Sequence, residues 1–347
     1  MKKTIRVKIL PAFQGDAIII DCVQDNFKIL VDAGTQRAYS KGIIKSEIEK
    51  TDKFDLLILT HTDEDHIGGL IKYLDDRERK KDAFNHIWFN NGEVIRTNLI
   101  KTNYSTPEIL LDDALDLDLS IKQGISLENK LNSIGLDSNE LICSGVIFSF
   151  KNIKITVLSP EIDDLKEFYD QWKLEKETKL EVAKADDYHK LIEDLLQNHY
   201  LEEGTLANKT SIAFILNYNE KNILMMGDAY PSVIEKNLRK LGFDENNKLN
   251  LDLVKVSHHG SKYGISPSLI KIIDCKNFVI STNGSNGLPF KECLARIVSH
   301  RNDNIRLYFN YKNEVTENIF MQQDFTNFNF EVQYLTQDNN YTIAIGE

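Results

Sequence analysis

The segment from Thr60 to Gly69, THTDEDHIGG, most constrains how this chain can fold. It places five ionisable side chains within six residues, directly after the apolar stretch 54–59. Imidazole and carboxylate groups together suit zinc, manganese or iron, so this cluster at a strand end indicates a metal site. A purely structural role for so many charges is the weaker interpretation. The Gly68-Gly69 pair allows the next backbone to pack closely, and residues 67–74 resemble the first turns of a helix.

Size and composition fit a soluble globular protein with a sizeable core. The chain has 347 residues, of which 41% are hydrophobic and 27% charged. No apolar run approaches the roughly 20 residues that span a bilayer, and the basic start of the chain lacks the apolar part of a secretory signal. The cysteines are scattered without a CxxC pair, which favours reduced thiols. We therefore expect a cytoplasmic protein without a membrane partner.

The net charge of −11 argues only weakly against a nucleic-acid partner. Most of the excess acidity lies in residues 161–203, and several other carboxylates belong to the proposed metal site. Bound cations would offset the latter. The charge balance therefore says little about the face that carries the site.

Apolar segments predict two groups of strands with helices between them. The first group is predicted at 5–10, 17–20, 27–31, 56–59 and 86–89, followed by a hairpin over 145–158. The second group is predicted at 211–216, 222–226, 251–256, 277–280, 330–334 and 341–345, with helices at 231–241 and 266–273. This order predicts an α/β protein with two sheets packed face to face and helices outside.

Two insertions interrupt this order, and we treat residues 1–347 as a single domain that contains them. Residues 161–203 lack Pro and Gly, and Leu165, Phe168, Tyr169 and Trp172 recur at helical spacing, as do apolar residues over 191–196. Two helices with packing faces are therefore predicted in an acidic, mostly helical segment. Residues 91–140 are predicted as an irregular insertion of loops and short helices. The acidic segment has two open roles, a lid over the site or a docking surface for a protein partner.

Two later segments also place metal-ligand types at strand ends. Residues 223–226 lead into Gly227-Asp228, and a carboxylate behind a glycine at a strand end can bridge two cations. Residues 253–256 lead into SHHGSK at 257–262, where adjacent His258 and His259 bring at least one imidazole to the same place. Each signal alone is modest, and their order behind His-x-Asp-x-Asp-His gives them weight.

With these segments, the chain resembles the metallo-β-lactamase-fold hydrolases. The resemblance is greatest to the branch that includes the nuclease-like domain of bacterial competence DNA-uptake channel proteins. It rests on QGDA at 14–17, VDAG at 31–34, residues 61–69, NKTS at 208–211, Gly227-Asp228 and SHHGS at 257–261. It implies a four-layer αββα sandwich with metals at the edge between the sheets.

The resemblance also implies a ligand set for two divalent ions, zinc or manganese. One ion would be held by His61, Asp63 and Asp228. The other would be held by Asp65, His66, Asp228 and one of His258 and His259, between which the sequence does not choose.

Asp32 would lie beneath the site and hydrogen-bond its ligands. Asp16 would act similarly or would cap a turn.

Two positions depart from the pattern of the wider family, and a third departs from that of the competence-like branch. Asp63 replaces a histidine, and Asn208 stands where a histidine ligand is common; both features are typical of the competence-like branch. Leu288 stands where that branch often has a histidine before a proline. A site with one metal is therefore an alternative to a dinuclear one.

The function implied by the resemblance is hydrolysis by metal-activated water. Asp65 would orient the water, and Ser261 and Lys262 would contact a phosphate oxygen, although Lys262 is equally well explained as a surface lysine. The first hypothesis is a phosphodiesterase or nuclease acting on DNA or RNA. The alternatives are a hydrolase of a small ester, amide, nucleotide or peptide, and a partner-binding protein with a residual metal site in a multi-protein defence or DNA-processing system.

Overall fold

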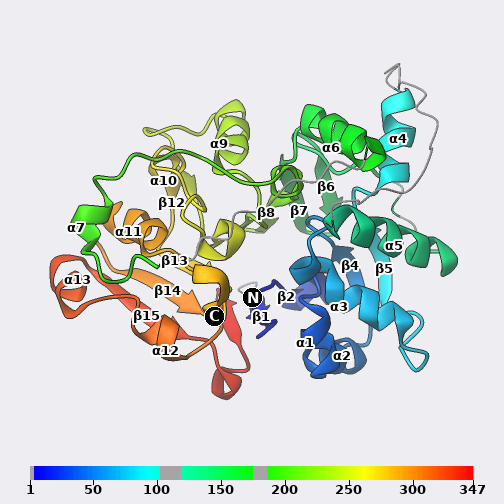
Figure 1. Cartoon of the computed structure of the whole chain (residues 1–347), viewed down its shortest axis with the longest axis horizontal. Helices are drawn as coiled ribbons and strands as arrows, with labels where there is room; N and C mark the ends of the chain where they lie inside the picture. The colour runs from blue at the N-terminus through cyan, green and yellow to red at the C-terminus, as the bar shows by residue number, and fades with distance from the viewer. Residues whose placement is uncertain (1–3, 102–118, 137, 139, 175–185, 347) are drawn as a thin grey trace.

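Two stacked β-sheets form the centre of the computed structural model (Figure 1). It describes residues 4–101, 119–136, 138, 140–174 and 186–346. Parts of both predicted insertions, 102–118 and 175–185, lie outside the described residues. Both terminal strands belong to the first sheet, where β1 and β16 pair antiparallel.

The first sheet has six strands in the order β16-β1-β2-β3-β4-β5. Strands β3, β4 and β5 run parallel, whereas β16, β1, β2 and β3 pair antiparallel. The bounds are β1 Ile5–Ile9, β2 Ile18–Cys22, β3 Phe27–Val31, β4 Phe54–Ile58, β5 Phe84–Trp88 and β16 Thr342–Ile345.

The second sheet has eight strands in the order β15-β14-β13-β11-β9-β8-β7-β6. The bounds are β6 Ile147–Phe150, β7 Ile153–Ser159, β8 Ala213–Tyr218, β9 Lys221–Met225, β11 Leu253–Lys255, β13 Asn277–Ile280, β14 Ile305–Phe309 and β15 Phe330–Tyr334. A small ladder joins β10 Leu249–Asn250 to β12 Ile273–Asp274. The sequence analysis did not identify β14.

The continuous apolar runs of the sequence are strands buried on both faces. In β2, Ile18 and Ile20 pack between the sheets, whereas Ile19 packs against helices on the outer face. In β4, Leu56 faces the other sheet and Leu57 faces the helices. Because both side-chain directions reach a core, the alternation expected of a half-buried strand is absent.

Helices cover both outer faces, which confirms the predicted αββα sandwich. On the first sheet these are α1 Gln36–Ser40, α2 Ile43–Lys50, α3 Glu64–Asp75 and α5 Leu119–Ser133. On the second sheet they are α7 Ile192–Leu195, α9 Pro231–Lys240, α10 Leu269–Ile272 and α11 Lys291–Ser299, with α12 Glu314–Glu317 and α13 Gln322–Asn327 nearby. None of the described helices has the length and apolarity needed to cross a membrane.

The two insertions pack on each other through helices α4 Gly92–Lys101, α5 and α6 Ile162–Leu174. Leu165 and Phe168 of α6 are buried with Ile95 of α4 and Ile121 of α5, beside α8 Leu206–Lys209. The side chain of Trp172 lies outside the described part. The predicted second helix is the single turn α7, and the rest of 186–203 consists of turns, bends and segments without regular structure. The apolar face of α6 is therefore internal packing.

The segment from Asp186 to Glu203 is fastened to the second half of the chain. The Asp187 carboxylate accepts hydrogen bonds from Lys291 N and Glu292 N, both at 2.8 Å, at the start of α11. Beneath it, Lys291 Nζ lies 2.6 Å from Asp324 Oδ2, and neither side chain reaches solvent. The Lys291 ammonium also donates to the carbonyl of Lys190 at 2.6 Å. These contacts hold the segment 186–203 in place against the second half of the chain.

We predict that Lys291→Met lowers the free energy of unfolding by about 3–5 kcal/mol, because it leaves the fully buried Asp324 carboxylate without its cation. Urea denaturation followed by circular dichroism would measure this. The matched control is Lys276→Met, which removes a partner of Asp303 from an exposed pair, and we expect no measurable change. Equal stability of the two variants would contradict the clamping role of Lys291.

Candidate metal centre

The candidate site lies where loops from both sheets meet. Strand β4 ends at Ile58, His61 follows, and Asp63 precedes α3, which carries Asp65 and His66 in its first turn. The helix reaches this place because Gly69 has no side chain; a Cβ there would lie 1.9 Å from the carbonyl oxygen of Ala33. From the second sheet, β9 leads to Asp228 and β11 leads to His258 and His259.

The first group of ligand atoms belongs to His61, His66 and Asp228. One atom from each lies within 4.8 Å of the others. His61 Nε2 is 3.9 Å from Asp228 Oδ2 and 3.4 Å from Asp63 Oδ2. The side chains of His61 and Asp228 are almost wholly buried, whereas Asp63 is 28% exposed. The structure thus brings the predicted set His61, Asp63 and Asp228 together and adds His66 beside it.

The second group consists of Asp65, His66 and His259, whose ligand atoms also lie within 4.8 Å of one another. His259 Nε2 is 3.4 Å from Asp65 Oδ2 and 3.6 Å from Asp228 Oδ2. His66 Nε2 is 3.4 Å from the same Asp228 oxygen. Asp228 Oδ2 therefore lies within 3.9 Å of imidazole nitrogens from both groups and would be available to cations held by either.

Asp32 lies directly beneath the site. Its Oδ2 is 2.8 Å from His66 Nδ1 and accepts a hydrogen bond from Thr60 Oγ1 at 2.8 Å, and its Oδ1 accepts one from Thr60 N at 2.8 Å. The Thr60 oxygen in turn lies 3.0 Å from His61 Nδ1. A carboxylate only accepts hydrogen bonds, so His66 carries its proton on Nδ1. The Thr60 hydroxyl donates its proton to Asp32 and therefore accepts a hydrogen bond from His61, whose ring also carries its proton on Nδ1. Both Nε2 atoms are thereby aimed at the ligand position.

The two adjacent histidines have different environments. His259 is buried, and its Nδ1 donates to the carbonyl of Ser281 at 3.0 Å, so its Nε2 faces the second group. The side chain of His258 is 35% exposed, and its Nδ1 accepts a hydrogen bond from Asn208 Nδ2 at 3.3 Å. The neutral His258 ring therefore carries its proton on Nε2, which lies 3.9 Å from Asp228. The geometry favours His259 as the ligand and leaves His258 at the rim.

Lys255 is a site residue that the sequence analysis missed. Its side chain is 1% exposed, its ammonium pairs with Asp16, and it donates to the carbonyl of Gly227 at 3.1 Å. It also lies 3.8 Å from Asp228 Oδ1. The sequence feature that could have identified it is a charged residue inside the otherwise apolar strand 253–256.

Asp16 could join His66 and Asp32 in a third group of ligand atoms. Its carboxylate is engaged instead by Lys255 and lies 3.5 Å from His259 Nδ1. These contacts assign Asp16 to the support of the ligands.

Without a cation, the carboxylates are balanced by protons on imidazole. Burial opposes the charged form of His259, but Asp228 and Asp16 outweigh it and raise the pKa of His259 to about 10. The same competition raises the pKa of His66 well above its usual range. Burial would raise the pKa of Asp65, yet His66 and His259 lower it to about 2. A bound cation would take the place of the imidazole protons.

Several buried polar atoms of this site have no hydrogen-bond partner among the described residues. They are Nε2 of His61, His66 and His259 and Oδ1 of Asp228. Such atoms are costly to bury unless something binds them. Three imidazole nitrogens beside carboxylate oxygens are the donor set that a divalent transition metal prefers, so the residues fit a metal centre.

Ser261 and Lys262 take different directions. Ser261 is buried and lines a hollow together with Asp228 and His258. Lys262 Nζ lies 3.8 Å from Glu292 Oε2 of α11, with its side chain 36% exposed. The structure therefore brings Ser261 to the site and turns Lys262 toward α11.

Comparison with protein families bears on the fold. Residues 10–82 match the model of the metallo-beta-lactamase superfamily. The chain has the metallo-β-lactamase fold. The match covers strands β2, β3 and β4, the Asp32 loop and the HTDEDH segment, and it does not distinguish branches of the superfamily. No curated protein matches the chain.

Solved structures with this fold are similar only at low identity. The metallo-beta-lactamase fold protein YhfI from Bacillus subtilis is 12% identical, with 96% of each chain covered and a TM-score of 0.41. CmlA, a diiron beta-hydroxylase from Streptomyces venezuelae, is 10% identical with a TM-score of 0.43. All of this chain is covered but only 54% of CmlA, so the chain spans about half of that protein. Similarity at this level carries no information about activity.

We predict that Asp228→Ala abolishes binding at both metal positions, because its carboxylate lies between the two groups of ligands. Elemental analysis of protein purified without chelators would measure metal per chain. Asp338→Ala, at an exposed position, is the control that keeps the wild-type content. Unchanged metal content in Asp228→Ala would refute the assignment.

A second prediction separates the adjacent histidines. His259→Ala is expected to lower metal affinity strongly, because it removes an aligned Nε2, whereas His258→Ala is expected to keep the wild-type metal content. Competition with a chromophoric chelator would give both affinities. If His258→Ala loses metal and His259→Ala retains it, the two roles are reversed.

Proposed function

We propose that this protein is a metal-dependent hydrolase that cleaves phosphodiester bonds with water. The observation that carries the proposal is the convergence on Asp228 of three buried imidazole Nε2 atoms that have no hydrogen-bond partner among the described residues. Divalent cations bound there would supply hydroxide near neutral pH and polarise the phosphoryl oxygen. We propose zinc or manganese, because the set combines imidazole with the carboxylates of Asp63, Asp65 and Asp228.

The protein's own groups at the rim have separate tasks in this proposal. Asp65 is 25% exposed and can accept a hydrogen bond from the attacking water. His258 presents Nε2–H at the rim, because Asn208 holds its Nδ1, and it stabilises the charge on the leaving oxygen by donating a hydrogen bond to it. The proton that this oxygen finally takes comes from solvent. The Ser261 hydroxyl binds a substrate oxygen. His258 would thus stabilise the leaving group in place of the histidine that the competence-like branch often has where this chain has Leu288.

The choice of a phosphodiester rests on the sequence resemblance to the competence-like branch. Asp63, Asn208 and the SHHGS segment at 257–261 are its features in this chain. DNA or RNA is therefore the first substrate class to test.

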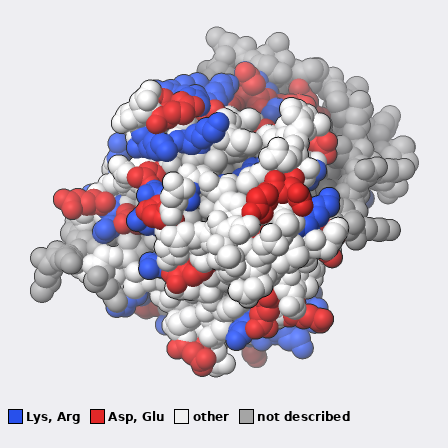
Figure 2. Space-filling view, turned by 90° about the vertical axis from the view of Figure 1, so that its left-hand side faces the viewer, with Lys and Arg blue, Asp and Glu red and all other residues white. Residues whose placement is uncertain are grey.

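Hydrolysis of a small ester, amide, nucleotide or peptide is the second candidate. On the face in Figure 2, outside the grey residues, Lys and Arg lie among Asp and Glu, with a basic band near the upper edge. In support of the second candidate, none of the described residues that line the hollow beside the metal centre is Lys or Arg, whereas a long polyanion usually requires a basic tract along its path.

Binding of a protein partner through the acidic segment remains the non-enzymatic alternative. The apolar stripe that motivated it is covered, because Leu165 and Phe168 pack against α4 and α5. A partner would therefore have to contact the charged outer side of α6.

Assays of the metal-loaded protein would test the proposal. The substrates are bis(p-nitrophenyl) phosphate, single-stranded DNA, RNA and p-nitrophenyl acetate, each with and without chelator. We expect chelator-sensitive hydrolysis of the phosphodiesters, and a loss of roughly 100-fold or more in kcat for Asp65→Asn, because the water loses its acceptor.

The control for this experiment is Asp338→Asn, which changes an exposed carboxylate in the same way and should retain full activity. Hydrolysis of the acetate ester alone would favour the small-ester candidate. Stoichiometric metal without hydrolysis of any substrate would favour the partner-binding alternative.

A further inference from the structure

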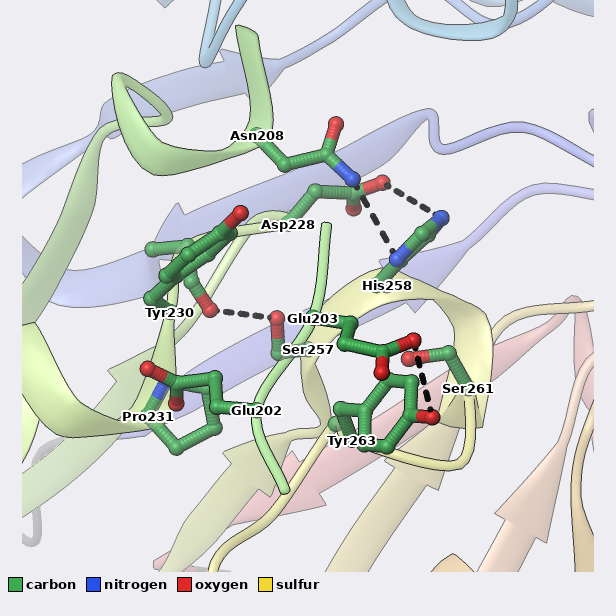
Figure 3. Close-up of a pocket in the computed structure, with 12 residues that line it drawn as sticks. Glu202, Glu203, Asn208, Asp228, Tyr230, Pro231, Ser257, His258, Ser261 and Tyr263 are labelled. Carbon is green, nitrogen blue, oxygen red and sulfur yellow. Dashed lines mark hydrogen bonds and ion pairs between the residues drawn. The ribbon is translucent and has the colours of Figure 1, made fainter. Parts of the chain in front are cut away.

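A second surface adjoins the metal centre and is separate from the hollow drawn in Figure 3. The lining of that hollow comes from residues 202–264. The second surface consists of Phe13 in the loop between β1 and β2, Arg37 and Lys41 on and after α1, and Tyr311 after β14. We call these four residues the Arg37 surface.

Two segments of the Arg37 surface are anchored to the residues that begin α3. A Cβ on Gly15, in the same loop as the phenylalanine, would lie 1.8 Å from the carbonyl oxygen of Asp65. Gln36, which precedes the arginine, donates its backbone N–H to Glu64 Oε1 at 2.8 Å. Helices α1 and α3 lie side by side in Figure 1. A substrate chain that leaves the metal centre past Asp65 in this direction therefore reaches the Arg37 surface.

The surface carries two cations that have no carboxylate partner. The guanidinium carbon of Arg37 lies 4.3 Å from the centre of the Phe13 ring, and no described residue forms an ion pair or hydrogen bond with this exposed group. Lys41 is also exposed and forms no ion pair with a described residue. Its N–H bonds to the carbonyl of Arg37 at 2.9 Å, so the two side chains lie one helical turn apart on the same side. Like charges at this spacing repel each other, and a bound anion would relieve the repulsion.

Arg37 differs in this from other arginines of the described part. Carboxylate partners are found for Arg96, Arg239, Arg296, Arg301 and Arg306. A guanidinium that packs on an aromatic ring and keeps its donors free is suited to bind an anion.

The aromatic residues hold the loop beside Arg37 and add a donor. Phe13 has a positive φ of 68°, which is unusual for a bulky residue, and its N–H donates to the Tyr311 hydroxyl at 2.7 Å. The proton of that hydroxyl is donated to no described residue and is available to a ligand oxygen. Burial raises the pKa of Tyr311 to about 12 despite the nearby charge of Arg37. The hydroxyl therefore keeps its proton at neutral pH.

We propose that the Arg37 surface binds the part of a single-stranded nucleic acid that flanks the linkage held at the metal centre. This proposal rests on the proposed function and deepens it. The guanidinium can bind a phosphate through two parallel hydrogen bonds, and Lys41 adds a second positive charge. Unpaired bases can stack on the guanidinium plane or against Phe13.

Kinetics of the metal-loaded full chain would test the proposal. The substrates are a short oligothymidylate and bis(p-nitrophenyl) phosphate, which has no neighbouring phosphate. Arg37→Ala should lower the ratio of kcat/KM on oligothymidylate to kcat/KM on the small diester roughly tenfold, because a charge-assisted contact is lost. Arg37→Lys keeps the charge and should lower this ratio less.

The matched control is Arg77→Ala. Arg77 is exposed and follows the C-terminal end of α3, whereas Asp65 lies in the first turn of that helix. The control should have the wild-type ratio.

Binding gives a readout that does not need turnover. The probe is a labelled oligothymidylate with phosphorothioate linkages, which keep the charge and slow hydrolysis, and fluorescence anisotropy gives its affinity for the metal-loaded protein. Arg37→Ala should reduce the slope of log affinity against log salt by about 0.7, the contribution of one single-strand phosphate contact, and Arg37→Lys should keep the slope. Polyglutamate of equal length should compete at least roughly tenfold less well, because its carboxylates lack bases that could stack.

The outcomes separate this proposal from the proposed function. Diester hydrolysis with an unchanged substrate ratio and an unchanged salt slope in Arg37→Ala would overturn the Arg37 surface and leave the hydrolase. Equal competition by polyglutamate would overturn it in favour of an acidic protein partner, and failure of the wild type to bind the oligothymidylate would overturn it outright. Binding that depends on Arg37, without hydrolysis of any diester, would overturn the hydrolase and leave the surface.

Discussion

The buried carboxylate of Asp228 is the group on which the arrangement of this site depends. His61 and His66 approach it from the first half of the chain and His259 from the second, all with Nε2 within 4 Å of Oδ2. Burying such a charge is unfavourable unless cations or hydrogen bonds compensate for it. Protonated imidazoles and Lys255 compensate in the absence of metal, and a divalent cation held by these residues would take over that role. Metal binding, protonation and the docking of the two halves would therefore be coupled.

Hydrogen bonds from the surrounding residues fix the orientation of the side chains around Asp228. Asp32 and Thr60 fix the rings of His61 and His66, and the carbonyl of Ser281 fixes His259. Farther out, the buried pair of Lys291 and Asp324 anchors the segment that ends at Glu203. A centre held by such outer contacts needs little reorganisation when a ligand arrives.

The architecture was largely predictable because strands buried on both faces leave long apolar runs, as in residues 17–20 and 56–59. Strand β14 was missed, since its exposed Arg306 and half-buried Tyr308 interrupt the run. The second helix predicted over 191–196 is only the turn α7. Its apolar residues Ile192 and Leu195 pack against the helical layer of the second sheet, so tertiary contacts and not helical periodicity account for their spacing.

For the site, the sequence by itself determined which side chains are available and that they follow strand ends, because a ligand run after an apolar strand is a local property of the chain. Only the tertiary structure distinguished His259 from His258, turned Lys262 away toward Glu292, and placed Lys255 under Asp16. It also brought Glu203 and Tyr263 to the same hollow from segments about sixty residues apart. Such choices depend on the direction of a side chain and on its neighbours across the two sheets, which spacing along the chain does not encode.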